Sequence, residues 1–386
     1  LVMVHSLFYL VTGLFPKNKK LWVFGCWEGK IYADNAKYLF EWVNENREDI
    51  IPVWITKNQD VYKILEEKGY RVAKAGTLRS FFYLAKAAVV IETEGNADIG
   101  GFRPGRCRVV QLWHGVAPKE MKWVKQYGGF QTFLKKIVFD DHQKSYWMVS
   151  SERNKEDFQR FFGVDDDHIF ITGYSRNDSL LNSSMKSNVI QLLEMNYPEC
   201  KKIIYMPTHR NFGLDDEKFS LNKMKKVNRF LHINNYVLVF KPHFHELKKY
   251  LEIESELTNI VLAKDQGLYA DVYSYLGGFD LLICDYSSVI YDYLCTKKPI
   301  VLFPYDIDSY KKNVGLFDCY ESMPCGPFCY SWDEVLNEIR DIFKEDNWFE
   351  RRERNRVTFH PHIDGKNSKR ICDAINEILT RRGGRY

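Results

Sequence analysis

Short apolar runs rich in β-branched and aromatic residues alternate along this chain with stretches of helical spacing. Turn residues bound the runs, and the stretches between them repeat apolar side chains every three or four positions, as Ala36, Leu39, Phe40 and Val43 do. Because a strand followed by a helix returns to a parallel neighbour, this alternation predicts a parallel sheet with helices on both faces. The predicted strands of the first half are 21–24, 53–55, 88–91, 109–113, 147–149 and 169–171.

The same alternation starts again in the second half of the chain. A length of 386 residues exceeds what one compact core usually holds, so we expect two domains. Asn, Ser and Asp become dense between residues 174 and 200, which places the boundary there. The sequence therefore predicts an α/β protein with domains at 1–174 and 175–386. The predicted strands of the second domain are 203–206, 236–240, 260–262, 281–283 and 300–303.

Charge and cysteine usage narrow the function classes. The 55 Lys and Arg against 51 Asp and Glu give a net charge of +4, which does not support nucleic-acid binding by charge. The nine cysteines are scattered, odd in number and without a CxxC pair, which argues against a disulfide framework and a structural zinc site. A reducing, cytosolic setting fits this usage best.

The first sixteen residues are mostly apolar and are followed by Lys17, Lys19 and Lys20. This run is shorter than the roughly 20 residues that span a bilayer. Its positive charges follow the apolar stretch and no small-residue cleavage site appears, so the pattern differs from that of a signal peptide. Two interpretations stay open, a helix packed on the domain surface and an anchor at a membrane interface.

The candidate site is the set of polar residues that directly follow the predicted strands, because ligands of parallel sheets bind beyond the carboxyl ends of the strands. His114 and Gly115 follow the strand at 109–113, and the glycine permits a sharp turn with close approach of a ligand to the backbone. An imidazole in such a turn suits a general base or a phosphate contact. Three further strands end in the polar segments 207–210, 241–245 and 285–288.

The segment 285–288 leads into a predicted helix with a serine near its N-cap. Ser287 and Ser288 serve either as a helix cap alone or as part of an anion site at the positive end of the helix dipole. The residues themselves leave both interpretations open.

The motifs of several common enzyme classes are absent from the sequence. No G-x-G-x-x-G, G-x-x-x-x-G-K-[ST] or G-x-S-x-G pattern occurs, which argues against a dehydrogenase, a P-loop kinase and a hydrolase with a nucleophile elbow. His243, His245 and Glu246 are a weak metal signal, since their spacing does not direct the two rings to one point. The acidic run 165–167 fits a solvated loop before a strand better than a metal motif. We assign no metal ligands.

Five ordered blocks resemble the CDP-glycerol glycerophosphotransferases of wall teichoic acid synthesis. They lie at 111–115, 173–178, 205–210, 241–243 and 280–293, and the segment 364–368 is similar to a sixth block. The resemblance covers residues from about 110 to 370. It implies a GT-B-type architecture, in which two Rossmann-like domains enclose a cleft, the first on the acceptor side and the second binding the CDP donor.

The resemblance also implies a reaction, the transfer of glycerol phosphate from CDP-glycerol to a hydroxyl of a lipid-linked or oligomeric acceptor with release of CMP. His114 is then the base that deprotonates the acceptor hydroxyl, and His243 assists at the pyrophosphate. Phosphoryl transfer needs mainly positioning and neutralisation of charge, and we assign no cofactor besides the donor substrate. The residues expected to line the donor site are Trp113, Gly115, Val116, Ala117, Arg176, Pro207, Thr208, Arg210, Lys241, Pro242, Asp285, Ser287, Ser288 and Asp292.

Three departures from the family pattern leave the polyol and the acceptor open. The segment 115–118 reads Gly-Val-Ala-Pro where the family usually has Gly-Thr-Pro, Ser175 replaces a proline, and His209 replaces an aromatic residue. CDP-ribitol is therefore a second possible donor, and the acceptor is a teichoic acid or a teichoic-type capsule. Two rival functions also stay open, that of a GT-B glycosyltransferase that uses a nucleotide sugar and that of a catalytically silent GT-B relative.

Two basic segments bear on the acceptor and on the membrane. Lysines alternate with aromatic residues between 119 and 136, a pattern that either holds an anionic lipid-linked acceptor at a membrane surface or forms a solvated helix with a packed aromatic face. We expect a cytoplasmic protein, peripheral on the inner face of the membrane, that binds a CDP-polyol and no nucleic acid. The second basic segment is expected to be a solvated face and comprises Arg351, Arg352, Arg354 and Arg356.

Overall fold

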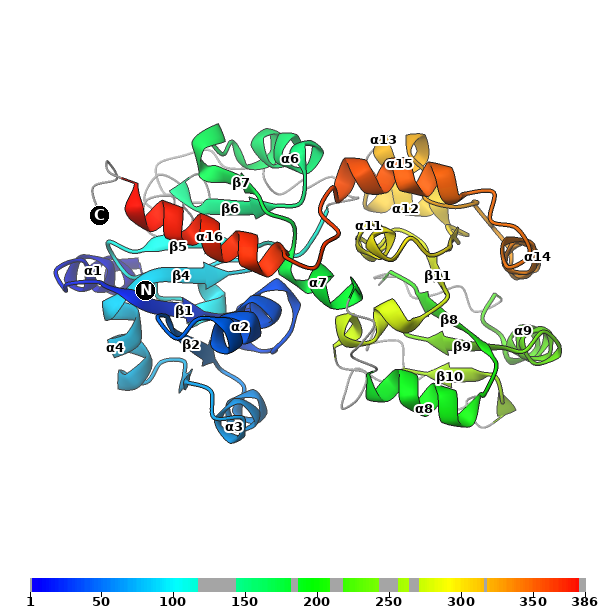
Figure 1. The fold of residues 1–386 in the computed structure, drawn as a ribbon, viewed down its shortest axis with the longest axis horizontal. Coiled ribbons are helices and arrows are strands. Elements are labelled where there is room, and N and C mark those ends of the chain that lie inside the picture. The colour runs from blue at the N-terminus through cyan, green and yellow to red at the C-terminus, as the bar shows by residue number, and fades with distance from the viewer. Residues whose placement is uncertain are drawn as a thin grey trace. The chain divides into compact units, whose positions relative to one another are not determined.

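The computed structural model of the chain describes residues 2–116, 144–181, 187–208, 218–242, 256–263, 271–315 and 318–381. It contains two parallel sheets of seven and five strands, which confirms the predicted α/β class (Figure 1). One compact unit comprises residues 1–114, 121–178 and 361–386, and the other comprises 115–120 and 179–360. The residues from 361 onward thus group with the first unit, whereas the sequence-based division at 174/175 placed them with the second half.

The sheet of the first unit has the strand order β3-β2-β1-β4-β5-β6-β7, and all its neighbours are parallel. The chain moves outward from β1 to β3, then returns to β4 beside β1 and moves outward the other way, so the strand order reverses between β1 and β4. Ligands of open α/β sheets bind at the carboxyl end of such a reversal. The strands are β1 (Asn18–Phe24), β2 (Ile51–Thr56), β3 (Val72–Lys74), β4 (Ala87–Glu92), β5 (Arg108–Gln111), β6 (Tyr146–Val149) and β7 (Ile169–Ile171).

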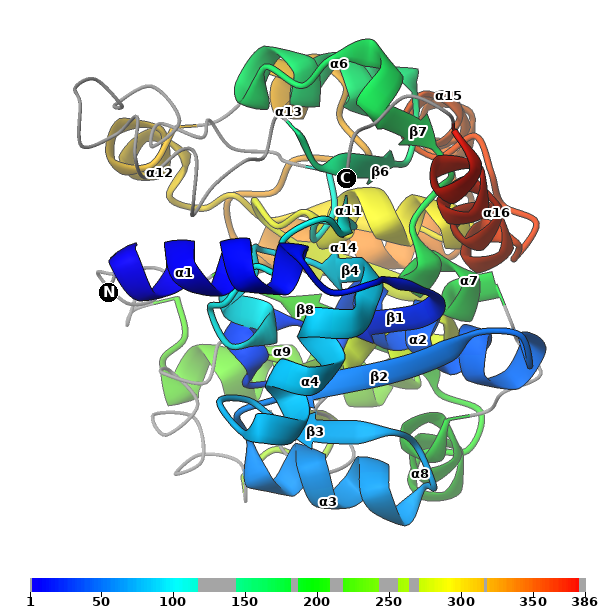
Figure 2. The same cartoon turned by 90° about the vertical axis from the view of Figure 1, so that its left-hand side faces the viewer.

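Helices cover both faces of this sheet, as the alternating pattern predicts. On one face α2 buries Leu39 and Val43 beside Ile371 and Ile375 of α16, the helix that brings the end of the chain back to the first unit (Figure 1). On the other face α1 and α4 lie side by side, and the rings of Phe8 and Phe81 have centroids 5.5 Å apart (Figure 2). The helices are α1 (Val2–Gly13), α2 (Asp34–Asn46), α3 (Gln59–Glu67), α4 (Leu78–Lys86), α6 (Glu152–Phe162), α7 (Ser175–Leu181, which runs into the second unit) and α16 (Asn367–Thr380).

Side-chain caps start several of these helices where the sequence supplies Asn, Ser or Thr. Asn58 accepts a hydrogen bond from the backbone N–H of Asp60 at the start of α3, and Ser151 accepts one from Asn154 at the start of α6. Thr77 and Ser80 form a reciprocal capping box on α4. Such caps satisfy the first backbone donors of a helix and fix where it begins.

The sheet of the second unit has the order β10-β9-β8-β11-β12, again entirely parallel and with its reversal between β8 and β11. Its core contains the stacked rings of Tyr205 and Phe240, with centroids 5.2 Å apart, against Trp332. The strands are β8 (Lys201–Met206), β9 (Tyr236–Phe240), β10 (Ile260–Leu262), β11 (Leu281–Cys284) and β12 (Ile300–Leu302). The helices are α8 (Asn188–Asn196), α9 (Leu221–Ile233), α11 (Val289–Tyr293), α12 (Ile307–Asn313), α13 (Asp318–Ser322), α14 (Trp332–Ile342) and α15 (Phe349–Phe359).

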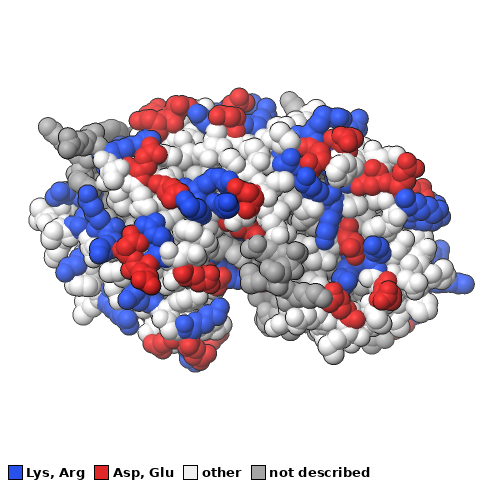
Figure 3. Space-filling model, viewed as in Figure 1, with Lys and Arg blue, Asp and Glu red and all other residues white. Residues whose placement is uncertain are grey.

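Basic and acidic side chains are interspersed on the face drawn in Figure 3. The expectation that the arginines at 351–356 form a solvated face is wrong for two of the four. Arg352 is 1% exposed and pairs with Asp346, and Arg356 is buried, where it pairs with Glu353. Both lie on the inner side of α15, because helical spacing carries positions 352 and 356 to the same face.

Among the described residues, no helix is both long enough and apolar enough to cross a bilayer. Helix α1 packs Phe8 against the first unit, yet it leaves Leu7, Leu10 and the following Leu14 exposed. The face with Phe8 fits a helix packed on the domain, and the exposed leucines fit an anchor at a membrane interface. Both interpretations of the apolar N-terminal run therefore stay open.

Candidate active site

His114 lies at the carboxyl edge of the first unit's sheet, in the turn that follows β5. Its neighbours Trp113 and Gly115 both have left-handed backbone conformations, with φ of 52° and 116°, so the chain turns sharply as the His-Gly pair predicts. The Trp113 ring stacks on the imidazole with centroids 4.1 Å apart, and it packs in turn against Trp147 and Phe162. A buried aromatic wall therefore holds the His114 ring in place.

The loop that follows β1 brings a second indole to His114. The ring centroid of Trp27 is 5.7 Å from that of His114, and Trp27 Nε1 donates a hydrogen bond of 3.1 Å to Asp34 Oδ2. Among the described residues, eight that are not glycine have positive φ, and four of them surround this site. Such conformations cost energy and concentrate at functional sites. The four are Trp27, Glu28, Asp34 and Trp113.

A buried ion pair joins the β1 loop to the His114 turn. Arg176 Nη1 lies 2.6 Å from Asp34 Oδ1, and the two side chains are 3% and 5% exposed. Arg176 Nη2 donates a second hydrogen bond, of 2.9 Å, to the main-chain carbonyl of His114. Charge-assisted bonds made by a planar guanidinium fix direction as well as distance. Arg176 therefore fixes the position of the His114 backbone through that carbonyl.

Asn35 ties the same turn to the start of α7. Its Nδ2 donates to the main-chain carbonyl of Trp113 at 2.9 Å, and its own main-chain carbonyl accepts a hydrogen bond of 2.6 Å from Ser175 Oγ. Asn35 is fully buried, so these polar groups exchange hydrogen bonds with one another in place of water. The departure from the family pattern at Ser175 thus adds a hydroxyl that contacts α2.

The His114 imidazole is held in its neutral form. Burial lowers its pKa below the ordinary histidine value, and the neighbouring Arg176 charge acts in the same direction, whereas Asp34, the Thr93 backbone and Asp98 oppose the shift. Nδ1 is buried and has no hydrogen-bond partner among the described residues. A neutral imidazole at neutral pH is the form that can accept a proton.

Carboxylates from the loop after β4 complete this edge of the sheet. Asp98 is fully buried and accepts hydrogen bonds from the backbone N–H groups of Glu28, Thr93 and Glu94, at 2.7 to 2.9 Å. Glu94 is half-buried, and burial together with the charges of Asp98, Glu28 and Asp34 raises its pKa to about 7. Asp98 is therefore a structural anchor, while Glu94 is a carboxyl group that titrates near neutral pH.

The second unit gathers its polar residues at the same kind of edge. Asp285, which follows β11, accepts hydrogen bonds from the N–H and the hydroxyl of Thr208, which follows β8, at 2.8 and 2.6 Å. Lys241 follows β9, and its N–H donates to Tyr205 O at 2.9 Å. The carboxyl ends of three adjacent strands thus meet where the strand order reverses, the expected place for a ligand.

The helix that follows β11 begins where the sequence predicts it. Ser288 is the N-cap residue of α11, which confirms a serine at that position, although its side chain makes no capping hydrogen bond. The preceding Ser287 Oγ accepts a hydrogen bond of 3.4 Å from Val289 N. Ser287 and Ser288 are half-buried, whereas Asp292 is fully buried and accepts a hydrogen bond of 2.7 Å from Tyr273 OH. The Asp292 carboxylate therefore makes a buried hydrogen bond within the second unit.

The structure brings several predicted site residues together within each unit. Trp113, His114 and Arg176 converge in the first unit. Gly115 and the buried Val116 follow His114 in the chain and group with the second unit. The second unit brings together Pro207, Thr208, Lys241, Pro242, Asp285, Ser287 and Ser288 at its carboxyl edge. Ala117, Arg210 and His243 lie outside the described residues, as do His245, Glu246, His209 and the basic-aromatic stretch 119–136.

Sequence reasoning missed five residues around His114. Each of them follows β1 or β4, strands that the sequence did predict, so the search for polar residues after apolar runs could have found all of them except Trp27. Their chemistry is less conspicuous than that of a histidine followed by a glycine. The five are Trp27, Asp34, Asn35, Glu94 and Asp98.

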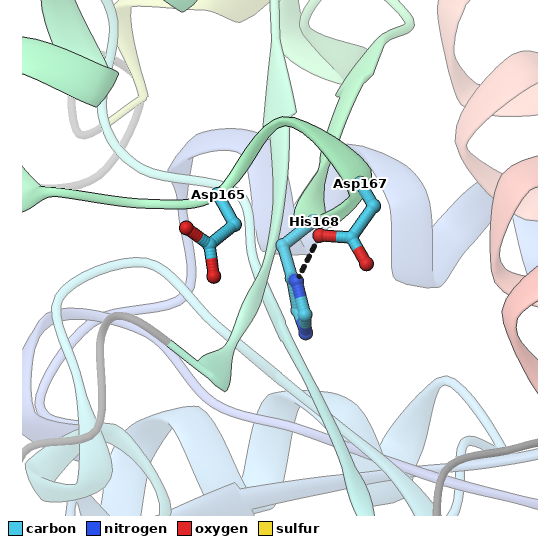
Figure 4. A group of neighbouring side chains, drawn as sticks. All are labelled: Asp165, Asp167 and His168. Atoms are coloured by element: carbon cyan, nitrogen blue, oxygen red, sulfur yellow. Dashed lines mark hydrogen bonds and ion pairs between the residues drawn. The ribbon is translucent and has the colours of Figure 1, made fainter.

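Among the described residues, a possible cation cluster consists of Asp165, Asp167 and His168 (Figure 4). The two carboxylates are exposed, and His168 Nδ1 is 2.8 Å from Asp167 Oδ1. Asp166 between them pairs with Lys155 at 2.6 Å. The cluster precedes β7, at the amino edge of the sheet and away from the carboxyl edge where His114 lies. The three aspartates of this segment are exposed, as the sequence predicts, although the segment includes a short 3-10 helix at Asp166–His168 in place of a loop.

Known proteins resemble this chain over most of its length or nearly all of it. It is 25% identical to the teichoic acid poly(glycerol phosphate) polymerase of Bacillus spizizenii, with 97% of this chain and 96% of that protein covered. It is 27% identical to the teichoic acid glycerol-phosphate transferase of Staphylococcus aureus, with 96% of each covered. A teichoic acid ribitol-phosphate primase of Bacillus spizizenii is 28% identical, with 70% of each covered.

Solved structures support the fold. That of the wall teichoic acid polymerase TagF superposes with a TM-score of 0.79 at 22% identity, covering 97% of this chain and 93% of that one. The two parallel α/β units are therefore of the GT-B type.

The fold and these relatives together define a GT-B-type transferase of the teichoic acid class, one that moves a polyol phosphate. Residues 7–377 match the model of the CDP-glycerol:poly(glycerophosphate) glycerophosphotransferase family. The chain belongs to that family, and the predicted resemblance is confirmed.

Proposed function

We propose that this enzyme transfers glycerol phosphate from CDP-glycerol to a hydroxyl group of a lipid-linked or oligomeric teichoic-type acceptor and releases CMP. The first unit binds the acceptor and the second binds the donor. The observation that carries the proposal is the neutral imidazole of His114, which Trp113 and Arg176 hold at the carboxyl edge of the first sheet.

His114 acts as the general base. Its imidazole accepts the proton of the acceptor hydroxyl while the oxygen attacks the phosphorus that carries the glycerol. The bond from this phosphorus to the bridging oxygen breaks, and the oxygen leaves on CMP. A base of lowered pKa stays unprotonated at neutral pH, and a fixed ring saves the cost of orienting it during the reaction.

The second unit supplies the donor contacts in this proposal. Thr208 and Lys241 follow adjacent strands, and the hydroxyls of Ser287 and Ser288 stand at the start of α11. Cations, hydroxyls and backbone N–H groups of this kind neutralise the charge of a pyrophosphate as it redistributes. Ala117, Arg210 and His243 belong to the donor site by resemblance, with His243 stabilising the charge that moves onto CMP.

CDP-ribitol is the second candidate donor. The ribitol-phosphate primase is 28% identical to this chain, against 25% and 27% for the two glycerol-phosphate proteins, so identity does not separate the two polyols. A ribitol unit carries two more hydroxylated carbons than glycerol and needs a longer pocket.

We further propose that the enzyme works at the inner face of the cytoplasmic membrane. The exposed side of α1 carries Leu7 and Leu10, with Leu14 just beyond its end, and Lys17, Lys19 and Lys20 follow. Apolar side chains beside lysines suit a helix that lies in the headgroup region of an anionic bilayer.

The test is CMP release by the purified protein with a glycerol-phosphate-primed lipid acceptor in detergent. CDP-glycerol and CDP-ribitol are supplied separately, and an active relative on the same acceptor is the control. Acceptor-dependent CMP release from CDP-glycerol supports the proposal. CMP release from CDP-ribitol alone would change the assigned donor from CDP-glycerol to CDP-ribitol. Release of a nucleoside diphosphate from a nucleotide sugar, with no CMP from either CDP-polyol, would overturn it in favour of a glycosyltransferase.

A further inference from the structure

Trp27 is an exposed indole next to the proposed catalytic base. It follows β1 at the point where the strand order of the first sheet reverses, and its ring centroid is 5.7 Å from that of His114. Trp27 is 37% exposed, whereas Trp113, on which the imidazole stacks, is 5% exposed. Trp113 is therefore the buried support of His114, and Trp27 offers open aromatic surface beside the same ring.

The backbone conformation of Trp27 is unfavourable and firmly held. Trp27 and Glu28 both have positive φ, of 46° and 55°. Buried Asp98 accepts a hydrogen bond of 2.7 Å from Glu28 N, and Gly25 approaches the Asp98 carbonyl so closely that a Cβ there would lie 2.3 Å from it. Strained residues persist where their surroundings over-determine them, and such sites are often functional.

The indole is also fixed by its own polar atom. Trp27 Nε1 donates to Asp34 Oδ2, and the other oxygen of Asp34 pairs with Arg176, the residue that binds the His114 carbonyl. One carboxylate thus sets the position of the Trp27 ring and, through Arg176, that of the His114 backbone. A large apolar ring held at a fixed place relative to a base is a positioned surface for the group on which that base acts.

We propose that the exposed face of Trp27 binds the carbon chain of the terminal polyol of the acceptor and so presents its hydroxyl to His114. This inference rests on the proposed function, because it assigns the acceptor to the side of His114. A polyol carries C–H groups between its hydroxyls, which pack on an indole face while the hydroxyls stay available for hydrogen bonding. An aromatic ring is well suited to such a ligand, since it gives a large contact area with few rotatable bonds.

The experiment compares Trp27→Ala and Trp27→Phe with wild type on a water-soluble glycerol-phosphate oligomer. Initial rates of CMP release are measured against acceptor at saturating CDP-glycerol, and against CDP-glycerol at saturating acceptor. We expect Trp27→Ala to raise the acceptor KM by about tenfold or more, which corresponds to about 1.4 kcal/mol, and to leave the donor KM within about twofold. Trp27→Phe keeps a ring and raises the acceptor KM less. Phe82→Ala, which removes an exposed ring of α4 in the same unit, leaves both KM values unchanged.

Other outcomes would overturn the inference. An unchanged acceptor KM with a reduced kcat would show that Trp27 merely positions His114, and a raised donor KM would assign the ring to the donor. Binding of the oligomer without donor, measured by calorimetry, separates this failure from failure of the proposed function. If wild type bound the oligomer tightly but released no CMP, the reaction would be wrong. If wild type and Trp27→Ala bound the oligomer equally, the assignment of Trp27 would be wrong.

Discussion

Arg176 donates a hydrogen bond of 2.9 Å to the main-chain carbonyl of His114, while its other terminal nitrogen pairs with Asp34. The resemblance to the family placed Arg176 in the lining of the donor site. In the structure its side chain is 3% exposed and is enclosed in the first unit, behind the proposed base. We therefore expect Arg176 to act as a positioning residue, through the backbone of His114.

Replacing His114 tests the base directly. We expect His114→Ala to lower kcat by about two to four orders of magnitude, because no neutral imidazole then accepts the acceptor proton. The KM for CDP-glycerol should change little. The matched control is His168→Ala, which removes a histidine at the amino edge of the same sheet and should leave kcat unchanged (Figure 4). Near wild-type turnover in His114→Ala would remove His114 from the mechanism.

The ion pair behind His114 predicts opposite pH shifts for its two partners. Asp34 raises the pKa of His114 and Arg176 lowers it. In a plot of kcat against pH, the acid limb should therefore move to lower pH in Asp34→Asn and to higher pH in Arg176→Met. Both changes also leave a buried charge unpaired, which costs about 3 kcal/mol of unfolding free energy.

A second ion pair, in which the arginine is buried and the aspartate is partly exposed, provides the control for that loss of stability. Arg352→Met breaks the pair with Asp346 in the second unit and should lower the melting temperature without moving the acid limb. Acid limbs that coincide in wild type and both site variants would show that this pair does not tune His114.

The donor side rests on the bond between Asp285 and Thr208. Asp285→Asn removes the negative charge and replaces one of the two acceptor oxygens by an NH2 group that cannot accept, so the hydrogen bonds that hold Thr208 in the loop after β8 weaken. We expect the KM for CDP-glycerol to rise about tenfold and the acceptor KM to stay constant, as measured by initial rates of CMP release.

Asp280→Asn is the matched control at the amino edge of the same sheet. Asp280 precedes β11 and accepts a hydrogen bond of 2.8 Å from Lys202 N, so its loss should cost comparable stability without changing the donor KM. An equal rise of the donor KM in both variants would indicate general loosening of the second unit and would contradict a specific role of Asp285 at the donor site.

The sequence predicted the strands and the position of His114 because both leave local signals. The apolar runs at 21–24, 88–91 and 203–206 lie within β1, β4 and β8, and a histidine before a glycine marks the turn after β5. The strand β3 was missed because Val-Ala-Lys has a single β-branched residue and ends in a charge, whereas the equally short β7, β10 and β12 are wholly apolar. The return of α16 to the first unit was missed because amphipathic spacing shows that a helix packs, but not which sheet it packs on.

The network behind His114 could not be predicted from spacing. Asp34 and Arg176 are 142 positions apart in the chain. Because charged residues are mostly exposed, the sequence alone predicts two separate surface residues and not a buried ion pair. Trp27 could not be assigned to the site from the sequence, because an aromatic residue after a strand is most often part of a core. Its exposure and its contact with His114 are tertiary facts.

Glu94 predicts how stability depends on pH. Burial and the charges of Asp98, Glu28 and Asp34 raise its pKa to about 7, above the ordinary value of 4.5. The folded protein therefore binds more protons at this site than the unfolded chain between about pH 4.5 and 7, so the site's contribution to stability falls as pH rises through that range. Glu94→Gln stays neutral and should remove this fall. After allowance for solvent screening of a half-exposed group, we expect it to gain about 1 kcal/mol over wild type at pH 8 and almost nothing at pH 4.5.

Unfolding by urea at pH 4.5, 6 and 8 measures this difference, with Glu48→Gln as the control because Glu48 is an exposed carboxylate of the same unit. A gain for Glu94→Gln that grows with pH, set against a flat difference for Glu48→Gln, would show that burial and the neighbouring carboxylates oppose ionisation of Glu94. An equal difference at all three pH values would mean that Glu94 titrates as an ordinary surface carboxyl. The folded protein would then hold Glu94 beside the three carboxylates of Asp98, Glu28 and Asp34 without a raised pKa, and Lys30, whose positive charge opposes the shift, would have to offset both the burial and the repulsion in full.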